Sequence, residues 1–153
     1  GKRWSLRLRD RPGMGWRQRE GTMPIELRLL VYSTALLLVL IVIQAVAGVR
    51  AKGLQVMADS RDGLSPPEGF HARALRVVDN HREGLLLFAP LILVASATGA
   101  LGATTVLGAK LFFYARVAHA VIYLLGLPRI RPLAWAVGLV GTLMVLAAVL
   151  GIA

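Results

Sequence analysis

Two groups of polar side chains lie in otherwise apolar stretches of this sequence. Each group has the spacing that places its members on one face of a helix. The groups are Arg76, Asn80 and Glu83 at i, i+4 and i+7, and Arg116, His119 and Tyr123 at i, i+3 and i+7. Polar and charged side chains are costly in apolar surroundings unless they pair with one another or face water. The two groups therefore indicate either a shared binding site or structural pairing.

The chemistry of these side chains favours a small anionic ligand. Guanidinium groups are in excess, because Arg129 and Arg131 follow the second group after a short turn. Arginine forks suit carboxylates, and a glutamate suits an ammonium group. A ligand with two carboxylates and one amine fits these partners, and glutathione is such a ligand. The sequence has no cysteine, so any thiol chemistry must use a thiol that the substrate brings.

The same residues also have a structural interpretation. Arg116 keeps its charge, so it needs an anion or a water-filled cavity, and Glu83 is the nearest carboxylate in predicted depth. A buried ion pair between the two, fixing the helix register, is the alternative to a ligand site. His119 equally suits a hydrogen bond between helices, and Tyr123 and Trp135 suit the membrane interface.

Long apolar stretches must position these groups. The chain has 153 residues, of which 56% are hydrophobic and 17% charged. Because a bilayer core requires about 20 helical residues, the uncharged stretches indicate membrane spans. We predict an all-α membrane protein, a bundle of four transmembrane helices over about residues 27–49, 82–102, 107–127 and 132–152, with a tight turn at 99–102. Ala134, Gly138 and Thr142 form a ladder of small residues that lets helices approach closely.

The only long polar connection, over residues 50–82, is basic. By the positive-inside rule we expect it to face the cytoplasm, with both chain ends on the opposite side of the membrane. Within it, Ser65 followed by two prolines and Glu68 predicts a helix start, with Ser65 as N-cap and Glu68 completing a capping box.

Residues 1–22 carry seven basic and two acidic side chains and few apolar ones. We expect them to form a basic, disordered N-terminal extension, and Met23 to be a plausible natural start. Residues 23–153 then form one transmembrane domain. Such a tail can attract anionic lipid, but no folded nucleic-acid-binding module is apparent, and nucleic acid is not an expected partner.

The pattern Arg76-x-x-x-Asn80-x-x-Glu83, followed by Arg116-x-x-His119-x-x-x-Tyr123 and Arg131, resembles the MAPEG family, the membrane-associated proteins of eicosanoid and glutathione metabolism. The resemblance covers roughly residues 23–153 and is nearest to small bacterial members. It implies four-helix subunits that assemble as a homotrimer, with glutathione bound between subunits. By position it implies that Arg131 stabilises the thiolate, that glutathione contacts Arg50, Asn80, Glu83, His119 and Tyr123, and that Arg76 and Arg116 shape the site.

The resulting expectation is a glutathione-dependent transferase or peroxidase of the bacterial inner membrane, with glutathione as co-substrate and no metal. Its partners would be its own copies, membrane lipid and hydrophobic electrophiles from the bilayer. The alternative is a non-enzymatic MAPEG-fold protein whose polar cluster is structural or binds lipid or small anions. Asp79, Pro132 and Trp135 differ from the arginine, serine and tyrosine of animal enzymes and favour this alternative.

Overall fold

The computed structural model describes residues 22–60, 63–127 and 129–152. All regular structure in these ranges is helical, which confirms the predicted all-α class for this part of the chain. Four long helices and one short one follow in the order α1 (Ile25–Lys52), α2 (Leu54–Ala58), α3 (Gly69–Thr98), α4 (Ala103–Leu125) and α5 (Arg131–Val149). The predicted extension over residues 1–22 lies outside the described residues except for Thr22.

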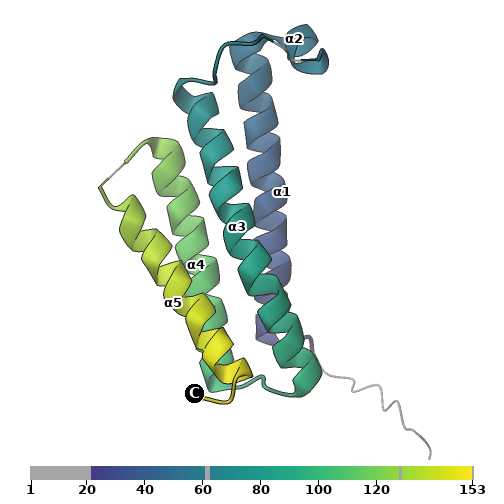
Figure 1. The fold of residues 1–153 in the computed structure, drawn as a ribbon, viewed down its shortest axis with the longest axis vertical. Helices are drawn as coiled ribbons and strands as arrows, with labels where there is room; N and C mark the ends of the chain where they lie inside the picture. Colours follow the sequence, from purple (N-terminus) through teal and green to yellow (C-terminus); the bar gives the residue numbers. More distant parts are fainter. Residues whose placement is uncertain (1–21, 61–62, 128, 153) are drawn as a thin grey trace, which may run out of the picture.

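The long helices run alternately up and down (Figure 1). The α1–α3 connection, which contains α2, and the α4–α5 turn lie at one end of the bundle, which we call the loop end. The α3–α4 turn lies at the opposite end with the C-terminus. This turn is the predicted one: α3 ends at Gly99, whose left-handed backbone (φ 75°) closes the helix, and α4 begins at Ala103.

Three of the described helices, α1, α4 and α5, are long and apolar enough to cross a membrane. Helix α3 is long enough, with 30 residues, but it is less apolar than these three and is not counted among the candidate spans. Its first half carries the charged residues that the sequence analysis identified, and only its second half is continuously apolar. A fourth span over residues 82–102 therefore stays a prediction.

Aromatic stacking joins the two halves of the bundle. The rings of Phe88 on α3 and Phe112 on α4 are parallel, with centroids 3.9 Å apart, and both residues are fully buried. Leu29 of α1 and Val145 of α5 belong to the same core cluster. Outward-facing side chains such as Leu86 stay largely exposed, as expected of a surface that contacts lipid.

Helices α4 and α5 pack together more extensively than any other pair. A Cβ added at Gly108 would lie 2.7 Å from the Gly141 carbonyl oxygen, and one at Gly141 would lie 2.5 Å from the Gly108 oxygen. Glycine at both positions is therefore required by the approach of the two backbones. Of the predicted ladder on α5, Gly138 and Thr142 are buried and Ala134 is half-buried.

The start of α3 differs from the prediction. The helix begins at Gly69 with Glu68 as N-cap, no side chain caps it, and residues 64–68 are not helical. A residue that precedes proline is disfavoured in the helical region, which applies to Ser65 and Pro66, so the helix cannot start until the second proline has passed. Ser65 instead accepts a hydrogen bond from the Lys52 ammonium through its carbonyl oxygen.

Candidate functional site

A pocket of about 450 Å³ opens between α3, α4 and the start of α5 near the loop end. We call it the polar groove. Six of the eight predicted site residues reach it, together with the three residues that differ from the animal enzymes. Its lining is Arg76, Asp79, Asn80, Glu83, His119, Tyr123, Arg131, Pro132 and Trp135. Residues of both spacing patterns thus line one pocket, and their role as ligands stays a prediction.

Arg116 lies beneath this groove and is 5% exposed. Its Nη1 donates a hydrogen bond to the Asn80 side-chain oxygen at 2.7 Å, and the Asn80 carbonyl oxygen is 3.4 Å away. Its guanidinium also lies over the Phe112 ring, 5.3 Å from the centroid. The ion pair between Arg116 and Glu83, which was the structural alternative to a ligand site, is absent from the described residues, where Asp79–Arg82 is the one ion pair formed. Asn80 replaces Glu83 as the buried partner.

Gly84 makes room for the Arg116 guanidinium. A Cβ at this position would lie 2.1 Å from Nη2 and 2.5 Å from Cζ of Arg116. The sequence analysis did not identify Gly84. The available signal was a glycine inside a predicted helix, directly after Glu83, because such a glycine often marks a place where another group approaches the backbone closely. Because Asn80 and Gly84 are one turn apart, the guanidinium rests on the α3 surface between them.

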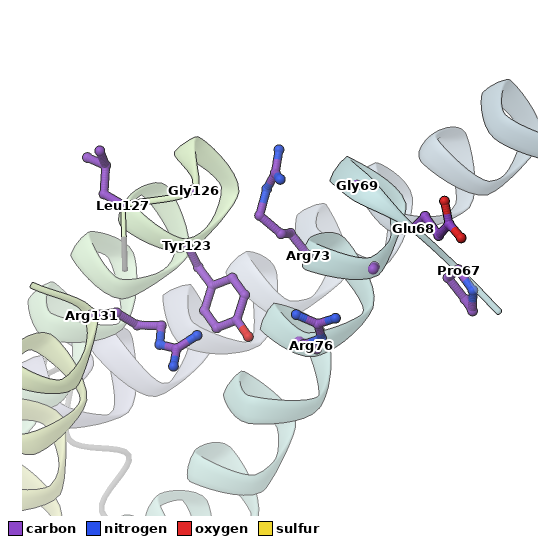
Figure 2. Close-up of a pocket in the computed structure, with 10 residues that line it drawn as sticks. Pro67, Glu68, Gly69, Arg73, Arg76, Tyr123, Gly126, Leu127 and Arg131 are labelled. Carbon is purple, nitrogen blue, oxygen red and sulfur yellow. The ribbon is translucent and has the colours of Figure 1, made fainter. Parts of the chain in front are cut away.

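Tyr123 connects the deeper and the outer parts of the groove. Its ring meets the buried His119 ring edge-on, with centroids 5.5 Å apart. The Arg131 guanidinium lies over the tyrosine ring, 4.7 Å from its centroid. Figure 2 shows the Tyr123 hydroxyl pointing into the space between the guanidinium groups of Arg76 and Arg131. A phenol and two cations thus surround one position where an anion can bind.

A second pocket of about 470 Å³ continues from the polar groove toward the loop end (Figure 2). We call it the loop-end pocket. It shares Arg76, Tyr123 and Arg131 with the polar groove and reaches the start of α3 and the end of α4. Its other lining residues are Pro67, Glu68, Gly69, Ala72, Arg73, Gly126 and Leu127. Sequence analysis missed Arg73, although it lies three residues before Arg76 and continues the same helical face.

Arg50 is the one predicted site residue that lies away from both pockets. It is exposed at the end of α1 and lines a separate, largely apolar pocket of about 550 Å³ together with Phe70 and His71. Within one subunit it therefore does not join the other predicted ligands. Its contact with glutathione stays a prediction that requires a neighbouring subunit.

Two further buried polar contacts connect α1 to the rest of the bundle. The ring of His81, 2% exposed, places Nε2 2.9 Å from the Ser33 carbonyl oxygen. At the other end, the Thr105 hydroxyl lies 2.7 Å from Oε1 of the buried Glu26. The sequence offered one signal for these two contacts: a polar residue inside an apolar helix needs a polar partner.

Comparison with known proteins supports the resemblance. The model of the MAPEG family matches residues 29–151, which extends from the first turns of α1 to the end of α5. Neither a curated protein nor a solved structure matches the chain significantly. With three apolar helices long enough to span a bilayer, the chain is an integral membrane protein, and it belongs to the MAPEG family.

Proposed function

We propose that this protein is a membrane-bound, glutathione-dependent enzyme of the transferase or peroxidase type, acting on hydrophobic electrophiles that arrive from the bilayer. Family membership supports a function related to glutathione. The observation that carries the assignment is the convergence of six predicted residues on one groove. Its volume of about 450 Å³ lies in the range of small-molecule sites.

The groove complements the charges of glutathione. Arg76 supplies a guanidinium fork for a carboxylate, and Glu83, which is exposed and has no ion-pair partner among the described residues, supplies a carboxylate for the ammonium group. Asn80 has its side-chain oxygen occupied by Arg116, so its amide N–H groups are left to donate to the ligand.

Arg131 has the position and charge to activate the thiol. A free thiol is mostly protonated at neutral pH, and a neighbouring guanidinium lowers its pKa. In the proposed reaction the thiol proton leaves to water. The thiolate sulfur then forms a bond to an electrophilic carbon, whose leaving group departs with the electron pair. The Tyr123 hydroxyl, beside Arg131, would donate a hydrogen bond to the sulfur.

A homotrimer accounts for two features of the single chain. Glu83 and the Asp79–Arg82 pair are exposed on α3, and charged groups that face lipid are costly unless another surface covers them. Arg50 is exposed on a different face. We propose that a neighbouring subunit covers the polar groove and contributes its Arg50 to the ligand.

The proposed topology has four spans, with the apolar half of α3 as the second. Basic residues concentrate at the loop end, which the positive-inside rule assigns to the cytoplasmic face of a bacterial inner membrane. They include Arg50, Lys52, Arg73, Arg76, Arg129 and Arg131.

The competing proposal is a non-enzymatic MAPEG-fold protein. The Arg116–Asn80 hydrogen bond favours it, because this buried contact is complete without a ligand. Asp79 also favours it, since its carboxylate lines the groove where a carboxylate of glutathione would bind. The two proposals differ in whether glutathione binds at all.

Calorimetric titration of glutathione into the detergent-purified protein separates them. The enzyme proposal predicts saturable binding that is weakened in Arg131→Ala and in Glu83→Gln. Glu83→Gln removes the partner of the ammonium group and leaves both members of the Arg116–Asn80 hydrogen bond unaltered. Lys110→Ala is the matched control, because this exposed residue lines none of the described pockets. Absence of binding at millimolar glutathione would leave the non-enzymatic protein as the conclusion.

A further inference from the structure

Three arginines line the loop-end pocket without a carboxylate partner. In the ranges that the structure describes, neither Arg73, Arg76 nor Arg131 forms an ion pair. One carboxylate, that of the exposed Glu68, lines the same pocket. Three arginines against one glutamate leave the pocket with a net positive charge. The three arginines line this pocket from α3 and from the start of α5, and Figure 2 shows the Tyr123 ring between Arg76 and Arg131, with the Arg73 guanidinium nearer the end of α4.

Arg73 is held in place by the end of α4. Its Nε donates a hydrogen bond to the Leu124 carbonyl oxygen at 3.3 Å, and its Cζ lies 5.9 Å from the Phe70 ring centroid. Leu124 is in the last turn of α4, where carbonyl groups lack helical partners and a cation is favourable. This contact uses only Nε. The terminal amino groups of Arg73 have no hydrogen-bond partner among the described residues and are free to bind a ligand.

The first turn of α3 adds hydrogen-bond donors. Gly69, the first helical residue, lines the pocket, and no side chain caps the N-terminus of this helix. Backbone N–H groups at such a terminus bind anions, and the helix dipole adds to the attraction. The N-terminus of α3 therefore adds to the attraction that the arginines exert on an anion. By itself it would not define a binding site.

The position of the pocket indicates its ligand. It opens at the loop end. In the proposed topology the helices leave the membrane at this end, at the level of the lipid phosphates. Leu127 lines it and Phe70 lies next to Arg73, and both are nearly half exposed, so an apolar surface is available beside the cations. A phosphate offers more acceptor oxygens than a carboxylate and can be shared by several arginine forks.

We propose that the loop-end pocket, which adjoins the polar groove and shares Arg76 with it, is a phosphate site in which Arg73 and Arg76 bind the phosphate group of an anionic lipid headgroup or of a soluble phosphate. Arg73 separates this proposal from glutathione binding, because it lines the loop-end pocket and lies outside the lining of the polar groove. It assigns a role to Arg73, which no ligand in the polar groove requires.

The test measures lipid binding to the delipidated full-length protein in a nonionic detergent. Phosphatidylglycerol and phosphatidylcholine with the same acyl chains are titrated and counted by native mass spectrometry, and inorganic phosphate is titrated by calorimetry. We expect saturable binding of phosphatidylglycerol, weaker binding of phosphatidylcholine, and a loss of about tenfold in affinity for Arg73→Gln. Binding of inorganic phosphate with the same dependence on Arg73 would identify a soluble phosphate as the ligand instead of lipid.

Two variants control for charge and for folding. Arg129→Gln removes one positive charge at the same end of the bundle from an exposed residue that does not line the pocket, and should leave the affinity unchanged. Arg73→Lys keeps the charge but loses the planar fork, and should bind more weakly than the unaltered protein even if Arg73→Gln fails to fold. Equal losses in Arg73→Gln and Arg129→Gln, or no saturable binding of either phosphate source, would overturn the proposal. Glutathione binding should be unchanged in Arg73→Gln, so the two proposals fail independently.

Discussion

The Arg116 guanidinium donates to the Asn80 side-chain oxygen at 2.7 Å, and this buried contact joins α4 to α3 beneath the polar groove. An amide whose oxygen is occupied can only donate from its remaining atoms. Arg116 therefore fixes which end of the Asn80 amide faces the groove, and would act on the proposed ligand through this amide. This assigns Arg116 a positioning role, consistent with the expectation that it shapes the site.

Adding a methyl group at Gly84 should disrupt this contact. In Gly84→Ala the new Cβ would lie 2.1 Å from Arg116 Nη2, so the guanidinium must leave its position against Asn80. We expect the free energy of unfolding to fall by about 1–3 kcal/mol. The measurement is the thermal unfolding midpoint of the purified protein in detergent.

Gly138 provides the matched control, since it faces Arg116 from the opposite helix. A Cβ there would be 3.5 Å from Arg116 Nε, an ordinary contact distance. Gly138→Ala should therefore be neutral or stabilising by up to about 1 kcal/mol, because alanine favours the helix over glycine. Equal midpoints for the two alanine variants would show that the guanidinium does not occupy the space above Gly84.

Gly141→Ala tests the close approach of α4 and α5. Helix propensity alone predicts a gain of about 1 kcal/mol. The new Cβ, however, would lie 2.5 Å from the Gly108 carbonyl oxygen and 2.7 Å from the Phe112 nitrogen, and neither backbone atom can move without separating the helices. We expect a net loss of about 1–3 kcal/mol, seen as a lower unfolding midpoint. A stabilised Gly141→Ala protein would contradict the observed helix packing.

The buried contact between Glu26 and Thr105 predicts an asymmetry between two substitutions. Thr105→Val keeps the shape but removes the hydroxyl, which also accepts the Gly102 backbone N–H, and leaves buried polar groups without partners. This should cost about 1–3 kcal/mol of unfolding free energy. Glu26→Gln retains an oxygen that can accept from Thr105 and should cost less than about 1 kcal/mol. Comparable losses in both variants would mean that the charge of Glu26, and not its hydrogen bond, is required.

The helices and the two polar helix faces could be predicted from the sequence because both depend on local spacing. The apolar stretches fix which residues form α1, α4 and α5, and the i, i+4, i+7 pattern fixes that Arg76, Asn80 and Glu83 share a face. Which polar residue meets Arg116 could not be predicted the same way. That depends on the axial offset between α3 and α4, which Gly84 and the Phe88–Phe112 stack determine.

Residues far apart in the sequence account for the other differences. Spacing indicates that Arg50 ends the first span, but the face on which it lies depends on how α1 packs against α3, which places it away from the polar groove within one subunit. The start of α3 shifted because two consecutive prolines outweigh a capping pattern that looks complete in sequence. Local signals were thus reliable for the elements, and unreliable for contacts between them.

Bound glutathione should reveal the contribution of Arg131 directly. If its guanidinium, which lies over the Tyr123 ring, stabilises the thiolate, the pKa of the bound thiol lies below its ordinary value. Arg131→Gln should raise that pKa by about one unit, so that less thiolate is present at a given pH. Ultraviolet difference spectra of the complex, recorded across a pH series, measure the thiolate fraction.

Tyr123→Phe, which keeps the ring beneath the guanidinium and loses only a hydrogen bond to the sulfur, should give a smaller shift of the thiol pKa in the same direction. An unchanged titration in Arg131→Gln, with glutathione still bound, would assign thiol activation to another residue of the groove.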